Sequence, residues 1–157
     1  MTSTLPSGIY IANVDEIDAI VEIEKKCFPG KVAYSKRQLE CLILNANSYC
    51  LVEKENGVIR AFLIVIYRQR SLTCNIETID VDPAFKNRGI GLKLLKAAEI
   101  DIKRRGMRWC QLEVSEGNEA ALKVYKNAGY TFKERLEGYY KFEHNGTRNA
   151  IRMVKEF

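Results

Sequence analysis

The stretch CNIETIDVDPAFKNRGIGLKLLK, residues 74–96, decides the fold of this chain. Its first eight residues are mostly β-branched or small, which predicts a strand over 74–81. Asp82-Pro83 ends that strand, because proline has no N–H to offer a strand ladder. The turn Lys86-Asn87-Arg88-Gly89-Ile90-Gly91 follows, and Leu92 begins an amphipathic helix. The first-turn N–H groups of a helix lack partners and lie at its positive end, so the stretch predicts a site for a phosphate-like anion.

Two other phosphate-binding motifs do not match this turn. A Walker loop requires Gly-Lys-Ser/Thr, and a dinucleotide-binding fingerprint requires a third glycine and a shorter connection from the strand. A Gly-x-Gly at a helix start is by itself also typical of a plain tight turn. The order strand, Val-Asp-Pro, Lys-x-x-Gly-x-Gly, helix resembles the coenzyme A pyrophosphate loop of the GNAT superfamily of N-acetyltransferases. That family has Gln or Arg where this chain has Lys86, which keeps the charge and loses the planar fork.

The composition is that of one folded domain over residues 1–157. Apolar residues make up 46% of the chain, no apolar run reaches the ~20 residues of a membrane span, and the N-terminus lacks signal-peptide features. Five cysteines without Cys-x-x-Cys spacing are expected to be reduced, buried thiols of a cytoplasmic protein. With His144 as the single histidine, a histidine-based metal site is not expected. The net charge of +5 comes from scattered basic residues, which argues against nucleic-acid binding.

Periodicity and turn signals predict elements in the order β-α-α-β-β-β-α-β-α-β-β. Strands are expected over 8–14, 48–53, 57–68, 72–81, 108–114, 130–142 and 148–154, and helices over 15–28, 35–44, 89–105 and 118–129. Asn56-Gly57 predicts a hairpin, and Ser35-x-x-Gln38 is a capping-box pattern. The fold class is therefore α/β. This order is also that of the GNAT fold, which implies a mixed, mostly antiparallel seven-stranded sheet, flanked by four helices and splayed between its fourth and fifth strands.

A second group of residues lies further along the chain: Leu112-Glu113-Val114, Asn118, Ala121, Tyr125 and Gly129-Tyr130. Asn118 and Gly129 are also typical helix-capping residues. The combination is similar to the signature of GNAT enzymes that acetylate protein N-termini. The spacing of twelve from Glu113 to Tyr125 matches the RimI-like branch, the ribosomal-protein-alanine N-acetyltransferases. So does the ending with Tyr139-Tyr140 and Asn149-Ala150-x-x-Met153, although the branch typically has Asp at the position of Asn149.

The resemblance assigns roles to these residues. Glu113 would take the proton of an α-amino group, whose pKa of ~8 requires only a modest base, and Tyr125 would protonate the departing thiolate. Acetyl-CoA would be held by Ile79, Asp80, Val81, Lys86, Asn87, Arg88, Gly89, Ile90, Gly91, Leu92, Asn118 and Tyr125. The substrate slot would be lined by Phe28, Pro29, Tyr34, Glu77, Tyr139 and Tyr140.

Alternatives stay open for both the base and the substrate. Some relatives carry a base on the fourth strand, where this chain has Asn75, so Glu77, two residues on and expected on the same face, and water stand beside Glu113 as candidates. The expected substrates are protein or peptide N-termini, with ribosomal proteins among them. A small amine such as a polyamine is the alternative, although acids are scattered along the sequence. A non-catalytic acyl-CoA-binding module is the third reading, against which Glu113 and Tyr125 argue.

Overall fold

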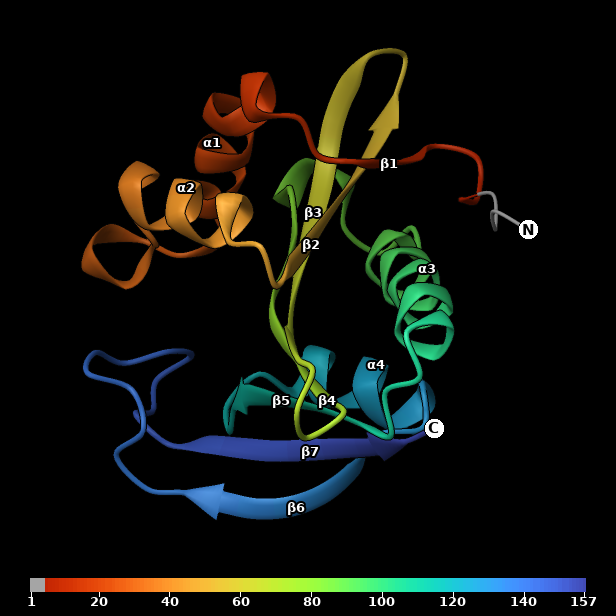
Figure 1. The fold of residues 1–157 in the computed structure, drawn as a ribbon. Helices are drawn as coiled ribbons and strands as arrows, with labels where there is room; N and C mark the ends of the chain where they lie inside the picture. The colour runs from red at the N-terminus through yellow and green to blue at the C-terminus, as the bar shows by residue number, and fades with distance from the viewer. Residues whose placement is uncertain (1–4) are drawn as a thin grey trace.

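A seven-stranded sheet with the order β1-β2-β3-β4-β5-β7-β6 forms the centre of the structure, a computed structural model that describes residues 5–157. All neighbouring strands are antiparallel except β4 and β5, which are parallel. The strands are β1 (Ile9–Ile11), β2 (Ser48–Glu55), β3 (Val58–Arg68), β4 (Thr73–Val81), β5 (Trp109–Ser115), β6 (Thr131–Leu136) and β7 (Ala150–Glu156). The α-helices are α1 (Ile17–Cys27), α2 (Lys36–Leu44), α3 (Ile90–Arg104) and α4 (Glu119–Asn127), as Figure 1 shows.

The sheet opens into a fork between its two parallel strands. β4 and β5 pair only where Thr73–Ile76 lie beside Trp109–Leu112. Beyond this point β4 stays with β3 as far as Val81, while β5 stays with β7 as far as Ser115. The expected mixed sheet, splayed between its fourth and fifth strands, is confirmed (Figure 1).

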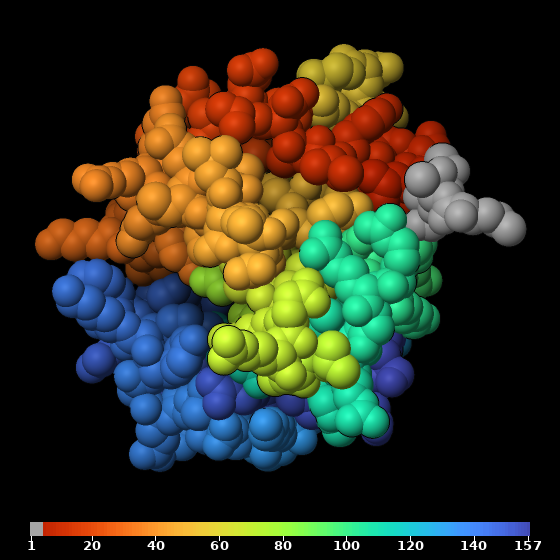
Figure 2. Space-filling model, viewed as in Figure 1, coloured from red at the N-terminus to blue at the C-terminus, as the bar shows by residue number. Residues whose placement is uncertain are grey.

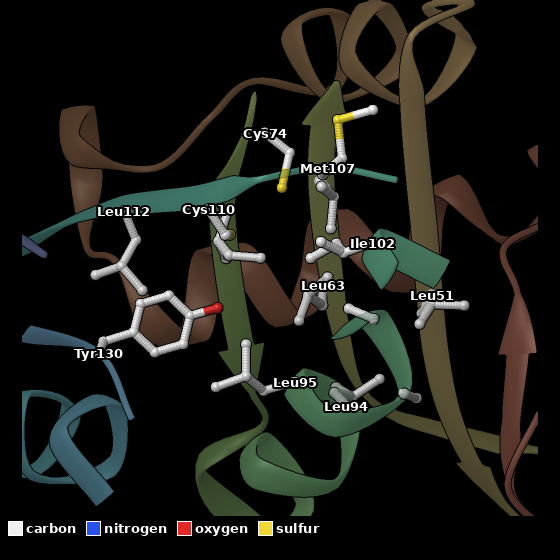
Figure 3. Packing of buried hydrophobic residues seen from close by; sticks show 14 of the residues in the cluster. Leu51, Leu63, Cys74, Leu94, Leu95, Ile102, Met107, Cys110, Leu112 and Tyr130 are labelled. Atoms are coloured by element: carbon white, nitrogen blue, oxygen red, sulfur yellow. The ribbon is translucent and has the colours of Figure 1, made fainter. Parts of the chain in front are cut away.

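Helices cover both faces of the strands that lead into the fork. α1 and α2 pack on one face of β2, β3 and β4, and α3 packs on the other. Successive side chains of a strand point to opposite faces of the sheet, so β3 packs against helices on both sides. Phe62 packs toward α1, whereas Leu63 packs toward α3. Figure 3 shows Leu63 beside Leu94, Leu95 and Ile102 of α3, which form the apolar face of this amphipathic helix.

Local turn and cap signals gave correct element boundaries. Asn56 and Gly57 have φ values of 51° and 77°, as a two-residue hairpin turn between antiparallel strands requires. Ser35 Oγ accepts the N–H of Gln38 at 3.2 Å, and Gln38 Oε1 accepts the N–H of Ser35 at 2.8 Å, so the capping box at α2 is confirmed.

The prediction was wrong for two strands and for two cysteines. The strand expected over 130–142 ends at Leu136, which pairs with Ala150 at the start of β7; within residues 138–147 the bridge between His144 and Thr147 is isolated and extends no strand. The strand expected over 8–14 spans only Ile9–Ile11, since residues 14–16 form a 3₁₀ turn. Cys41 is exposed and Cys27 half-buried, whereas the other three cysteines are buried as expected. Among residues 5–157, no helix is both long and apolar enough to cross a bilayer.

Candidate active site

The fork between β4 and β5 opens into a cavity of about 350 Å³. Nine of the residues predicted for the site line it: Phe28, Tyr34, Glu77, Ile79, Glu113, Asn118, Tyr125, Tyr139 and Tyr140. Pro29 is exposed outside the cavity, and Asp80, Val81 and residues 86–92 do not line it. On the face shown in Figure 2, N-terminal segments (red to orange) lie above C-terminal segments (blue).

One edge of the fork is a strand edge without a partner strand. The N–H of Asp82 donates to the carbonyl of Arg60 at 2.8 Å. Because every second residue of an antiparallel strand directs its N–H and C=O toward the partner strand, this bond shows which residues of β4 face β3. Asp80 therefore turns its backbone groups toward β3, while Ile79 and Val81 turn theirs toward the cleft. An extended amide-bearing ligand can pair with Ile79 and Val81, and Asp80 drops out of the expected set of backbone contacts.

A β-bulge at Glu77 changes the faces of β4. Ile76 lies opposite Val65 and Thr78 opposite Ile64, so Glu77 is the extra residue. Asn75 and Glu77 nevertheless both line the cavity, in keeping with the expectation that they share a face, and the bulge reverses the alternation only beyond Glu77. The bulge leaves Glu77 directed into the cleft, where its carboxylate accepts the hydroxyl of Tyr34 at 2.7 Å. Asn75 is 8% exposed, lines the cavity, and has an Oδ1 atom without a hydrogen-bond partner.

The N-terminus of α3 presents first-turn N–H groups without a side-chain cap beside the free edge of β4. Gly89 is the N-cap, in the left-handed region at a φ of 73°, and no side chain caps the first-turn N–H groups. Lys86 and Arg88 are exposed on this turn and, within residues 5–157, neither forms an ion pair. A Cβ at Gly91 would lie 3.6 Å from Val81 Cγ2, an ordinary van der Waals contact, so the packing of α3 against β4 leaves room for a methyl group there.

Glu113 projects into the cavity from β5. Its Oε2 accepts a hydrogen bond from Nε of Arg152 at 3.1 Å, and its Oε1 accepts a longer one from the hydroxyl of Tyr139 at 3.5 Å. Arg152 also donates to Glu134 at 2.8 Å, which fixes the guanidinium across β7 and β6. Glu113 is therefore a held, partly buried carboxylate, with a side chain that is 11% exposed.

Asn118, the N-cap of α4, and Tyr125 within α4 line the same cavity as Glu113. Asn118 caps α4, with its Oδ1 accepting the N–H of Ala121 at 3.2 Å, so its amide hydrogens remain for a ligand. Burial raises the pKa of Tyr125 above its ordinary value, and the hydroxyl stays protonated at neutral pH. A neutral phenol can donate a proton to an anion that forms beside it.

Aromatic side chains close the other end of the cavity. The ring of His144 stacks on Tyr140, with centroids 3.8 Å apart, and lies 5.9 Å from the ring of Phe28. Tyr139 packs edge-on against Tyr140 at 5.0 Å. No local sequence signal places His144 against the end of α1, more than 100 positions away. The wall joins the loop after α1 to the loop between β6 and β7.

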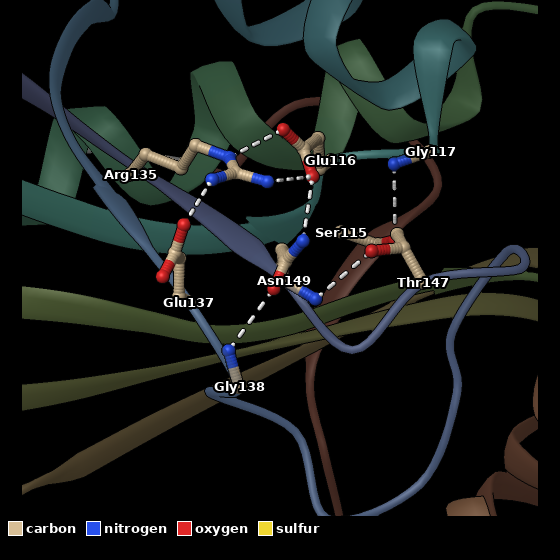
Figure 4. A network of polar contacts seen from close by, with 8 residues as sticks. All are labelled: Ser115, Glu116, Gly117, Arg135, Glu137, Gly138, Thr147 and Asn149. Atoms are coloured by element: carbon tan, nitrogen blue, oxygen red, sulfur yellow. Dashed lines mark hydrogen bonds and ion pairs between the residues drawn. The ribbon is translucent and has the colours of Figure 1, made fainter.

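The β6–β7 loop is tied to the β5–α4 loop through Asn149 (Figure 4). Its Nδ2 donates to Glu116 Oε2 at 3.1 Å, and its Oδ1 accepts the N–H of Gly138 at 3.0 Å. Arg135 holds the other side of Glu116. An ionised Asp could accept from Gly138 but could not donate to Glu116, which gives a physical reason for the amide at this position.

A match to a family model spans residues 17–130 and carries the description acetyltransferase (GNAT) family. This range includes the fork, the α3 turn and α4. The chain belongs to the GNAT family of acetyltransferases. The members of this family are enzymes that use acetyl-CoA as the acyl donor. The GNAT fold expected from the sequence is confirmed.

Relatives of this GNAT chain include N-terminal acetyltransferases. It is 39% identical over 122 residues to the N-alpha-acetyltransferase RimI of Mycobacterium tuberculosis, covering 76% of this chain and 75% of that protein. It is 28% identical over 137 residues to an uncharacterized N-acetyltransferase of Methanocaldococcus jannaschii, and the match spans only 61% of that protein. The crystal structure of the ribosomal-protein-S18-alanine N-acetyltransferase from Escherichia coli has the same fold, with a TM-score of 0.85 at 23% identity, over 94% of this chain and 92% of that one.

Proposed function

We propose that residues 1–157 act as one domain that transfers the acetyl group of acetyl-CoA to the α-amino group of protein or peptide N-termini. The observation that carries this proposal is the convergence at the fork. Ile79 on the free edge of β4, Glu113 and Tyr125 line one cavity, and the uncapped N-terminus of α3 lies beside the same strand edge. The relationship to RimI of Mycobacterium tuberculosis supports an N-terminal substrate, with ribosomal proteins among the candidates.

The donor would occupy the fork in a defined order. The N–H groups after Gly89, with Lys86 and Arg88, would hold the pyrophosphate. Ile79 and Val81 would pair with the pantetheine amides, and the amide hydrogens of Asn118 would bind the same arm. Acetyl-CoA, when bound, supplies the acetyl group as a thioester. These residues fit such a ligand, because the fork offers the uncapped N–H groups of α3, the unpaired edge of β4 and a cavity.

Glu113 and Tyr125 would move the two protons of the reaction. Glu113 Oε1 accepts the proton of the substrate ammonium, directly or through one water, while Arg152 holds Oε2. The hydroxyl of Tyr125 donates to the sulfur as the thiolate leaves. Glu77 is the competing base, since its carboxylate also faces the cavity.

The charges in the cavity favour a single amine over a polyamine. Three carboxyl groups line it, those of Glu24, Glu77 and Glu113, and no lysine or arginine does so among the described residues. Arg152 neutralises Glu113, and burial raises the pKa of Glu24 to about 9, so that it is uncharged at neutral pH. Glu77 is left as one unpaired carboxylate, which matches one ammonium group.

A turnover assay with acetyl-CoA and thiol release as the readout tests the proposal. The panel contains short peptides with free N-termini, the same peptides with blocked N-termini and an internal lysine, and spermidine. Acetylation confined to free N-termini, located by mass spectrometry, is the expected result. Turnover of spermidine alone, or of blocked peptides at equal rate, would overturn the N-terminal assignment.

A further inference from the structure

Two carboxyl side chains from distant parts of the chain are buried together behind the cavity. Glu24 of α1 and Asp80 of β4 are each 1% exposed. Neither belongs to a salt bridge within residues 5–157. Glu24 also lines the cavity, and Asp80 lies between Ile79 and Val81, the two residues of the free strand edge. The pair therefore sits where the substrate slot meets the coenzyme strand.

The hydrogen bonds around this pair leave one oxygen of each carboxyl without a donor. Glu24 Oε2 accepts the backbone N–H of Tyr34 at 3.1 Å, and Asp80 Oδ1 accepts the hydroxyl of Thr78 at 2.5 Å. Glu24 Oε1 and Asp80 Oδ2 are both buried and have no donor, and the two carboxyl groups are near enough for each to shift the pKa of the other. Two carboxylates would repel each other there and leave both oxygens unsatisfied. One proton between them removes both penalties.

We propose that Glu24 and Asp80 share one proton, and that this hydrogen bond positions the loop 28–35 of the substrate slot against the coenzyme strand β4. The positioning role rests on the proposed function, since it assumes that this loop binds the substrate. The link is continuous: Glu24 holds the backbone of Tyr34, and the hydroxyl of Tyr34 donates to Glu77 inside the cavity at 2.7 Å.

Among residues 5–157, no lysine or arginine forms an ion pair with either carboxyl group. The titratable or charged groups nearby are Lys26 and Cys27 on α1, Tyr34 in the loop, Glu77 and Asp82 along β4, Lys86 before α3, and Tyr125 on α4. Lys26 pairs with Asp82 at 3.1 Å, and the thiol of Cys27 donates to the carbonyl of Val81 at 3.2 Å. Burial and the contact with Asp80 raise the pKa of Glu24 to about 9, and burial raises that of Asp80 as well.

Infrared spectroscopy at pH 7 tests the shared proton directly. The wild type is expected to show the C=O band of a protonated carboxyl, and Glu24→Gln and Asp80→Asn are each expected to lose it. Both variants keep the shape of the pair, because the new amide donates to the remaining carboxylate. Glu22→Gln on the same helix, where Glu22 is exposed, is the matched control and keeps the band. Absence of the band in wild type, or its survival in both variants, would overturn the shared proton.

The pH dependence of the peptide KM tests the positioning role. Above about pH 9 the wild-type pair loses its proton, so the peptide KM is expected to rise by up to about tenfold per pH unit. Glu24→Gln should keep a flat peptide KM over this range, and the KM for acetyl-CoA should stay constant in both. An equal rise in wild type and Glu24→Gln would overturn the positioning role. If no peptide in the panel were acetylated, the proposed function would be overturned instead. The infrared test of the shared proton does not depend on that outcome.

Discussion

Replacing Glu24 by Gln is expected to change how the stability of the folded chain depends on pH. The glutamine can accept the N–H of Tyr34 and donate to Asp80, so it preserves the hydrogen bonds of the protonated pair. What it removes is a titrating group. The variant therefore isolates the proton of Glu24 from the packing around it.

The sign and size of the effect follow from the two states of the carboxyl. Unfolded, Glu24 loses its proton near its ordinary pKa of 4.5, whereas folded it keeps the proton up to a pKa of about 9. Between these values the folded state binds one more proton, so the free energy of unfolding falls as pH rises. The slope is about 1.4 kcal/mol per pH unit. From pH 6 to pH 8 the wild type should lose roughly 3 kcal/mol relative to Glu24→Gln.

Urea denaturation at pH 6, 7 and 8 measures this difference. Near pH 6 the wild type and Glu24→Gln should differ least, and at pH 8 the variant should be the more stable. In thermal melts the added difference corresponds to roughly 6–12 °C for a domain of this size. Glu22→Gln, on the solvent side of α1, should follow the wild type at every pH. Parallel stability curves for wild type and Glu24→Gln would refute a proton held by this pair.

Three further predictions, two of them with a comparison variant, address the reaction and the coenzyme loop. Glu113→Gln should lower kcat by roughly 10²–10⁴-fold, with partial recovery at higher pH where more amine is neutral; a wild-type rate at pH 7 would move the base to Glu77, which Glu77→Gln in parallel would reveal. Tyr125→Phe should lower kcat while calorimetry shows unchanged acetyl-CoA affinity, and an unchanged kcat would remove it as the proton donor. Gly89→Ala should cost roughly 1–2 kcal/mol in urea unfolding and weaken acetyl-CoA binding, because φ is +73° there. Gly91→Ala is the matched control, since its Cβ meets Val81 at an ordinary 3.6 Å; equal losses in both would contradict the distinction.

The order of elements could be predicted because its signals are local. A hairpin at Asn56-Gly57 depends on the φ values of two residues, and the cap of α2 depends on Ser35 and Gln38, three positions apart. The helix face of α3 follows from a 3.6-residue period. The end of β6 could not be predicted, because a strand continues only as far as its partner does, and β7 begins at Ala150.

By itself the sequence determined the strand, the glycine turn and the helix of residues 74–96, and, through the resemblance they carry, the family. Only the tertiary structure decided which face each side chain of β4 takes, because the bulge at Glu77 depends on pairing with β3. The same holds for Glu24 and Asp80, whose meeting depends on how α1 packs on β4 across 56 positions of sequence. Caps and turns are stabilised by interactions between residues that are neighbours in the sequence. Shared protons and strand registers depend on contacts between distant residues, which form only once the chain is folded.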